Sequence, residues 1–167
     1  MLKIIRDVQV WIVILLLAGA ASPAIAHTRS PSPEYVDSLL PAYLAVQAGL
    51  GENDVDAAKA SAKPLLAAAI RGPKNLSLSS SIGRIAKARD LATARRSFVR
   101  LTSAMLHLVE EVGTTGKTNL FLWECSQTEA SGSDIWLQSD RVARDPYHPE
   151  NSLECPKIQR KLVHQLP

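Results

Sequence analysis

The sequence predicts a mainly α fold: an antiparallel helical bundle with a C-terminal β-hairpin and an irregular Cys-containing loop. Apolar residues recur at spacings of three and four through residues 36–112, which is the period of a buried helix face. Short aromatic-rich runs follow at residues 120–123 and 135–137, which is typical of strands. Prolines interrupt regular structure beyond them, at Pro146, Pro149 and Pro156.

Residues 1–26 have the features of a secretory signal peptide. A basic start precedes the apolar run Val8–Ala21, and Ala24-Ile25-Ala26 has the small-x-small form that signal peptidase cuts. The run is too short to span a bilayer as a helix. We expect cleavage after Ala26 and a periplasmic or secreted protein, with an uncleaved membrane anchor as the alternative.

The composition is that of an ordinary globular protein. Of 167 residues 46% are hydrophobic, and 19 Lys and Arg against 16 Asp and Glu give a net charge of +3. Disordered and fibrous classes are excluded, and so mild an excess of positive charge does not indicate nucleic-acid binding. Beyond a flexible Ser-Pro-rich tail at residues 27–33, residues 34–167 form a single domain: helical bundle 34–113, hairpin and Cys loop 117–156, and C-terminal tail 157–167.

The first two helices differ in the size of the residues on their buried faces. The first has a stripe of large residues and ends at Gly49 or Gly51, and Pro41 either kinks it or marks its first turn. Its stripe is Val36, Leu39, Tyr43, Val46 and Leu50. The second, capped by Asn53 or Asp54 and ended by Gly72-Pro73, has small residues that permit close packing. These are Val55, Ala58, Ala62, Leu65 and Ala69.

A short segment around residues 82–88 leads to the longest helix, which Asp90 caps. Its stripe has the most regular period in the sequence: Leu91, Ala94, Phe98, Leu101, Met105, Leu108 and Val112. His107 lies on the opposite side from Met105 and is expected in solvent. Basic residues gather here, namely Arg84, Lys87, Arg89, Arg95, Arg96 and Arg100. A solvated face is the simpler interpretation, and contact with an acidic partner or anionic lipid is the alternative.

After Gly116 the two aromatic-rich runs predict a hairpin whose long loop covers residues 126–134. Prolines break up the chain that follows it. The last segment, Lys157 to Gln165, is predicted to add a final helical turn or two.

The two cysteines, Cys125 and Cys155, are 30 residues apart and bracket the hairpin and its following loop. Export favours a disulfide between them. Alternatively, two thiolates bind Cu(I) or Zn(II), with His148 as the nearest third donor. No nucleophile elbow, zinc-binding His pair or phosphate loop is present in the sequence, so enzyme activity is not predicted.

Several segments resemble a bacterial exported family, the domain-of-unknown-function family numbered 3347. The segment Arg95-Arg96-Ser97-Phe98-Val99-Arg100-Leu101-Thr102-Ser103-Ala104-Met105 is similar to its "R-x-x-F-x-x-L-S-x-A-L" helix. Later segments follow in the family's order: Cys125-Ser126-Gln127, Trp136-Leu137-Gln138, Asp145-Pro146-Tyr147-His148-Pro149 and Ser152-Leu153-Glu154-Cys155-Pro156. Tyr43-Leu44, Gln47 and Leu50 resemble its opening helix, so the resemblance covers nearly all of the mature chain.

The resemblance implies a small helical domain with a hairpin, found alone or beside adaptor subunits of heavy-metal efflux pumps, with a role in handling copper or a similar metal. The family pattern has a Met after the first Cys and another before the second. Here Gln127 and Ser152 stand in those places, so the soft donors reduce to the two sulfurs.

Two functional hypotheses result. The first is an exported, non-enzymatic metal-binding or metal-efflux accessory domain in which Cys125 and Cys155, with His148, hold copper or zinc. The second is a structural or partner-binding envelope module whose cysteines form a disulfide and bind no metal. In the second, either the basic helical face or an apolar groove near Trp123 and Trp136 docks another envelope protein.

Overall fold

The fold is known from a computed structural model, which describes residues 30–74, 76–126, 134–151 and 155–162. The predicted signal peptide, residues 27–29 of the predicted tail and most of the hairpin loop lie outside these ranges. The described chain forms four α-helices, three β-strands and the short 3₁₀ helix η1 at Pro149–Asn151. The helices are α2 Pro33–Gly51, α3 Val55–Ala69, α4 Leu76–Ala86 and α5 Leu91–Val112, and the strands are β1 Leu120–Cys125, β2 Asp134–Gln138 and β3 Lys157–Leu162. The predicted mainly α class is confirmed.

The starts of three helices are fixed by side-chain caps. Asp90 Oδ1 accepts the Thr93 amide at 2.7 Å, which confirms the predicted cap of α5. For α3 the cap is Asp54, whose Oδ1 accepts the Ala57 amide at 2.8 Å. Ser32 caps α2, so this helix begins at Pro33 and takes in the last residue of the predicted tail. Each cap satisfies one of the amides that the first turn leaves without a helical partner.

The predicted stripe of α2 is buried over its whole length, and the helix continues through Pro41, which is therefore not its first turn. The small-residue stripe of α3 packs closely against α2. A Cβ built on Gly49 would lie 2.8 Å from the Ala58 backbone nitrogen, closer than real Cβ atoms approach. Only glycine permits this contact between the end of α2 and the start of α3.

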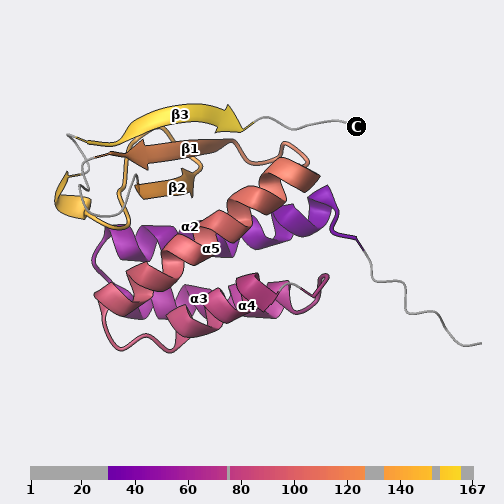
Figure 1. The fold of residues 1–167 in the computed structure, drawn as a ribbon, viewed down its shortest axis with the longest axis horizontal. Helices are drawn as coiled ribbons and strands as arrows, with labels where there is room; N and C mark the ends of the chain where they lie inside the picture. Colours follow the sequence, from indigo (N-terminus) through magenta and orange to yellow (C-terminus); the bar gives the residue numbers. More distant parts are fainter. Residues whose placement is uncertain (1–29, 75, 127–133, 152–154, 163–167) are drawn as a thin grey trace, which may run out of the picture.

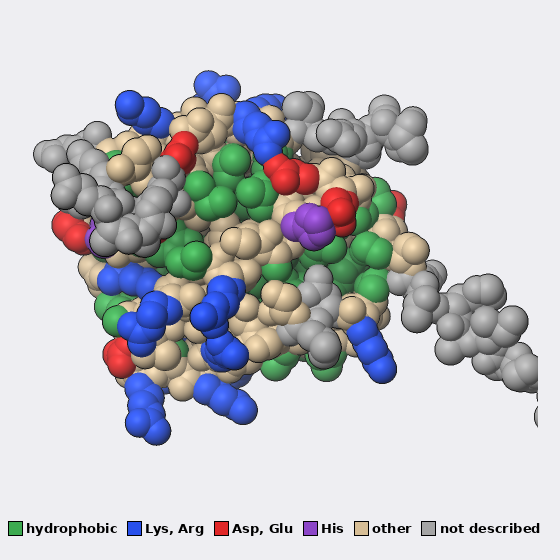
Figure 2. All heavy atoms as spheres, viewed as in Figure 1, with side chains coloured by type: hydrophobic (Ala, Val, Ile, Leu, Met, Phe, Trp, Pro, Cys, Tyr) green, Lys and Arg blue, Asp and Glu red, His purple; other side chains and the backbone are tan. Residues whose placement is uncertain are grey.

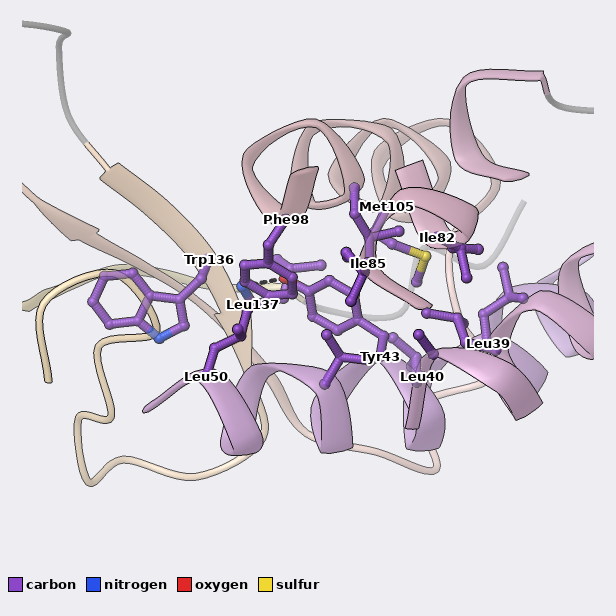
Figure 3. Packing of buried hydrophobic residues seen from close by; sticks show 14 of the residues in the cluster. Leu39, Leu40, Tyr43, Leu50, Ile82, Ile85, Phe98, Met105, Trp136 and Leu137 are labelled. Atoms are coloured by element: carbon purple, nitrogen blue, oxygen red, sulfur yellow. Dashed lines mark hydrogen bonds between the residues drawn. The ribbon is translucent and has the colours of Figure 1, made fainter. Parts of the chain in front are cut away.

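The core between the helices and the sheet centres on Tyr43 of α2. Its ring stacks on Phe98 of α5, with centroids 5.3 Å apart. Its hydroxyl is 2.9 Å from Thr102 Oγ1 and accepts the Leu137 amide of β2 at 3.2 Å (Figure 3). One buried phenol thus connects two helices and a strand, and its interior position raises its pKa above the ordinary value.

The sheet is antiparallel with the order β2-β1-β3. The predicted hairpin is confirmed, with Trp123 opposite Trp136 and Cys125 opposite Asp134. The predicted helical turns at 157–165 are wrong, because residues 157–162 form a third strand on the other edge of β1 and residues 163–167 lie outside the description. Pairing with the free edge of β1 gives hydrogen-bond partners to the backbone of residues 157–162. This gain outweighs the local helix propensity of the segment.

The sheet lies across α2 and α5, and α3 and α4 lie on the side of these helices away from the sheet (Figure 1). The aromatic cluster therefore occupies one side of α5, facing the sheet. The opposite side of α5 meets α4. Of the helices in the described ranges, none has the length and apolar character needed to cross a membrane.

Candidate functional site

The two cysteines form a disulfide, with Cα atoms 5.3 Å apart. Cys125 ends β1 and Cys155 lies just before β3, and the next pair along the strands is Glu124 opposite Lys157. Antiparallel pairing brings the end of one strand beside the start of the other, so the bridge closes this corner of the sheet. The side chains are 1% and 7% exposed, which makes the bridge a buried part of the core. The predicted disulfide is confirmed.

His148 lies at the same corner. Its Nε2 is 3.6 Å from Asp134 Oδ2, and Asp134 is the strand partner of Cys125. Its Nδ1 is 3.5 Å from Glu150 Oε1. The three residues predicted as metal ligands are therefore brought to one region, but each imidazole nitrogen faces a carboxylate.

The turn that carries His148 is organised by Asp145, which is fully buried. Asp145 Oδ1 accepts the backbone amides of Tyr147 at 2.8 Å and of His148 at 3.0 Å. An aspartate that binds amides two and three residues ahead fixes a tight turn. The Tyr147 hydroxyl then donates to the Ile135 carbonyl of β2 at 3.0 Å, which fastens the turn to the sheet.

The carboxylates beside His148 are shifted in opposite directions. Burial raises the pKa of Asp134, and the neighbouring His148 only partly offsets this. The pKa of Glu150 is lowered, first by a hydrogen bond from its own backbone and then by His148. Asp134 is thus more easily protonated, and Glu150 less easily protonated, than an ordinary carboxyl group of its own type.

The donor set does not fit a soft metal in this oxidised form. Both sulfurs are covalently joined, and a thiolate is the form of cysteine that binds copper or zinc. Among the described residues, no group of three or more His, Cys, Asp and Glu side chains is placed to hold a metal ion. Met105 is fully buried in the α5 stripe, as predicted, and Gln127 and Ser152 lie outside the described residues.

A buried polar pair, which was not predicted from the sequence, holds the loop after β2. Gln47 of α2 donates to the Arg144 carbonyl at 2.6 Å. Gln138, at the end of β2, accepts the Trp136 indole N–H at 3.1 Å and the Arg144 amide at 3.1 Å. The position of Gln47, four residues after Tyr43 on the buried face, was the available signal. A buried glutamine requires partners, and here they come from a distant loop.

A basic hollow of about 590 Å³ lies between α4 and the first half of α5. Its walls carry four cations, four hydroxyl side chains and one glycine, with no carboxylate among them. The lining residues are Ser79, Ser80, Gly83, Arg84, Lys87, Thr93, Arg96, Ser97 and Arg100. Figure 2 shows Lys and Arg side chains gathered over the part of this face where α4 meets the start of α5.

Arg95 does not belong to this surface, although its place in the sequence suggested that it did. Its guanidinium donates to the Pro146 carbonyl at 2.8 Å, to the Leu50 carbonyl at 3.2 Å and to Asn53 Oδ1 at 2.6 Å. Arg95 therefore joins three segments of the fold. The spacing of basic residues in the sequence does not show which of them forms hydrogen bonds within the fold.

A second hollow of about 400 Å³ continues along α5, and Arg100 lines both. Its other lining residues are Ser77, Val99, Ser103, Ala104 and His107. His107 has a side chain that is 66% exposed and contacts Glu111 at 3.1 Å, which confirms its predicted place in solvent.

The predicted apolar groove near Trp123 and Trp136 is not formed by these rings, which are 5% and 0% exposed. They stack on one another with centroids 6.1 Å apart. The indoles are core residues. Two hollows on the α4–α5 face, in contrast, are open to a partner.

No protein-family model matches the chain, and no curated protein or solved structure matches it. The family resemblance of the sequence therefore stays a prediction.

Proposed function

We propose that the chain is an exported, non-enzymatic binding module of the cell envelope, stabilised by the disulfide between Cys125 and Cys155. The disulfide is the observation that carries this proposal. Disulfides persist in the periplasm and outside the cell, whereas cytosolic thiols are kept reduced. The signal-like residues 1–26 indicate the same destination independently.

The proposal includes an antiparallel bundle of the four helices, as the sequence predicts. The short links between consecutive helices support it, because residues 52–54, 70–75 and 87–90 leave little chain for a long crossover. The resemblance further suggests a heavy-metal efflux system as the setting in which the module works.

The α4–α5 face is the binding surface in this proposal. Arg84, Lys87, Arg96 and Arg100 are exposed, and no carboxylate of the described chain lies within 4 Å of them. The buried polar residues Gln47, Gln138 and Asp145, in contrast, bind the backbone of the fold itself. The module's surface chemistry is thus suited to an anionic envelope component.

Cell fractionation combined with thiol labelling tests this function. The full chain is expressed in a bacterium with two membranes, and each fraction is denatured without reductant and treated with an alkylating agent. We expect the protein in the envelope fraction, with neither cysteine alkylated. A cytoplasmic protein with two alkylated cysteines would contradict the proposal.

A metal-binding accessory role is the second candidate, and one observation favours it. After reduction, Cys125 and Cys155 would be neighbouring thiols at the corner that His148 occupies beside Asp134. Titration of the reduced mature protein with Cu(I) and with Zn(II), beside a Cys125→Ser, Cys155→Ser double variant, tests this role. Equal binding by both proteins eliminates it.

A further inference from the structure

The basic hollow between α4 and α5 has the chemistry of a phosphate site. Arg84, Arg96 and Arg100 present guanidinium groups, whose planar forks match the oxygens of a phosphoryl group. The hydroxyls of Ser79 and Ser80, both from α4, line the same hollow and are further hydrogen-bond donors. An anion that enters the hollow therefore meets donors from both helices.

The adjoining hollow differs in polarity. Val99, of which 45% is exposed, and Ala104 present apolar surface there, and Arg100 forms the boundary between the two hollows. Phosphate chemistry and apolar surface thus follow one another along α5. A phospholipid has the same sequence of chemistry, from headgroup phosphate to apolar body.

The cations of this face are exposed, as Figure 2 shows for the Lys and Arg side chains there. A site for a small soluble phosphate usually has buried donors that replace water around the ion. Exposed cations on long apolar stems suit an extended anionic surface, where each contributes through its charge. The arrangement therefore favours a membrane over a soluble phosphate compound.

We infer that the α4–α5 face docks on an anionic phospholipid surface, with a headgroup phosphate in the basic hollow beside Gly83 and apolar lipid surface against Val99. This inference rests on the proposed function, because export brings the chain to the outer side of a membrane.

Vesicle flotation with the chain from His27 onward tests the inference. The preceding apolar segment would bring its own lipid affinity, and every described helix and strand begins after residue 32. One set of vesicles is pure phosphatidylcholine, and the other contains about one third phosphatidylglycerol. We expect binding only to the second set, weakening as salt increases. Equal binding to both sets, or to neither, would overturn the inference.

Charge variants show whether this face makes the contact. Each exposed basic residue near an anionic membrane changes affinity about fivefold, so Arg84→Gln with Arg96→Gln lowers it about 25-fold. The matched control is Lys157→Gln with Lys161→Gln, which removes the same charge from the exposed strand β3, across the molecule from α4 (Figure 1). An equal loss in both double variants would indicate diffuse attraction by net charge and overturn the inference.

A neutral substitution tests the hollow itself. A Cβ at Gly83 would meet no atom within 4 Å, so Gly83→Leu fills the hollow while the charge is unchanged. Leucine also favours a helix more than glycine does. We expect vesicle affinity to fall severalfold, while circular dichroism shows that the variant still folds. Unchanged affinity would show that no headgroup phosphate occupies the hollow and would overturn the inference.

Inorganic phosphate distinguishes the lipid from a soluble ligand. If the surface recognises lipid, titration with inorganic phosphate in the absence of vesicles shows no saturable binding, because a single ion on exposed cations gains no apolar contact. Saturable binding of phosphate without vesicles would overturn the lipid assignment. Because flotation uses purified protein, its failure leaves the fractionation result standing, and a cytoplasmic location leaves the vesicle result standing.

Discussion

At the scale of single residues, buried polar atoms decide the geometry around the aromatic core. The Tyr43 hydroxyl serves Thr102 of α5 and the Leu137 amide of β2, both inside the protein. Leaving a buried donor or acceptor without a partner costs more than one hydrogen bond contributes. The stability of the contact between helices and sheet therefore depends strongly on this one oxygen.

Tyr43→Phe is expected to lower the free energy of unfolding by about 1–3 kcal/mol, because it removes the hydroxyl that accepts the buried Leu137 amide. Urea denaturation measures the change. Tyr35→Phe is the matched control, since the half-buried Tyr35 hydroxyl makes one bond, to the Ala69 carbonyl at 3.3 Å. An equal loss in both variants would show that the Tyr43 connection has no special weight.

The cap of α5 gives a pH-dependent prediction. The hydrogen bond from the Thr93 amide holds the pKa of Asp90 below its ordinary value, with Arg96 and Arg89 contributing by charge. A carboxyl whose pKa is lowered on folding stabilises the protein above its unfolded pKa of about 3.9 and loses this effect as pH falls through the lower folded value. Asp90→Asn keeps an acceptor but cannot ionise.

We therefore expect wild type to be more stable than Asp90→Asn near pH 7, with the difference vanishing in strong acid. Urea midpoints across the acid range measure this. A difference that stays constant from neutral to strongly acid pH would contradict the role of the ionised carboxylate.

At this scale, side chains whose partners lie close in the sequence could be predicted, and side chains whose partners lie far away in the sequence could not. Asp90 and Met105 were predicted because capping and helical period are local rules. Gln138 and Arg95 were missed because their partners, such as Arg144 and Pro146, come from remote segments. No spacing in the sequence encodes those contacts.

At the scale of elements, a tight helix contact joins the end of α2 to the start of α3. Gly49→Ala would force a methyl group against the Ala58 backbone, so the two helices must separate. We expect a loss of about 1–3 kcal/mol in stability, as for other overpacked cores. Gly83→Ala in α4 is the control, because it meets no neighbour and should be neutral or stabilising by up to about 1 kcal/mol. Similar thermal shifts in both variants would refute the close contact.

The disulfide joins the end of β1 to the start of β3. For its 30-residue separation, the chain-entropy treatment gives a stabilisation of about 3.5 kcal/mol. We expect the Cys125→Ser, Cys155→Ser double variant to lose about that much in urea denaturation, while reduced wild type behaves like the variant. A double variant as stable as the oxidised protein would contradict this role of the bridge.

The strands show most clearly where prediction from local sequence patterns fails. β1 and β2 were predicted because aromatic and branched residues cluster in both runs. β3 was mistaken for helical turns because Lys157, Gln159 and Arg160 carry no strand signal of their own. Its conformation comes from the free edge of β1 and from the cysteine that brings it there.

At the scale of the whole molecule, two features lie in different layers of the fold. The disulfide and its neighbouring His148 lie at a corner of the sheet, and the basic hollow lies beyond α5, between it and α4. The bridge could be predicted, because export favours it. The hollow could not, because its walls come from two helices whose contact the sequence does not specify.

The central claim is that the protein works outside the cytoplasm with its two cysteines joined. The most direct measurement is the intact mass, under native and denaturing conditions, of protein isolated from the cell envelope without reductant. We predict the mass of the chain beginning at His27, less two hydrogen atoms, with no added metal. A chain that keeps residues 1–26, or a full complement of thiol hydrogens with copper or zinc bound, would contradict the account.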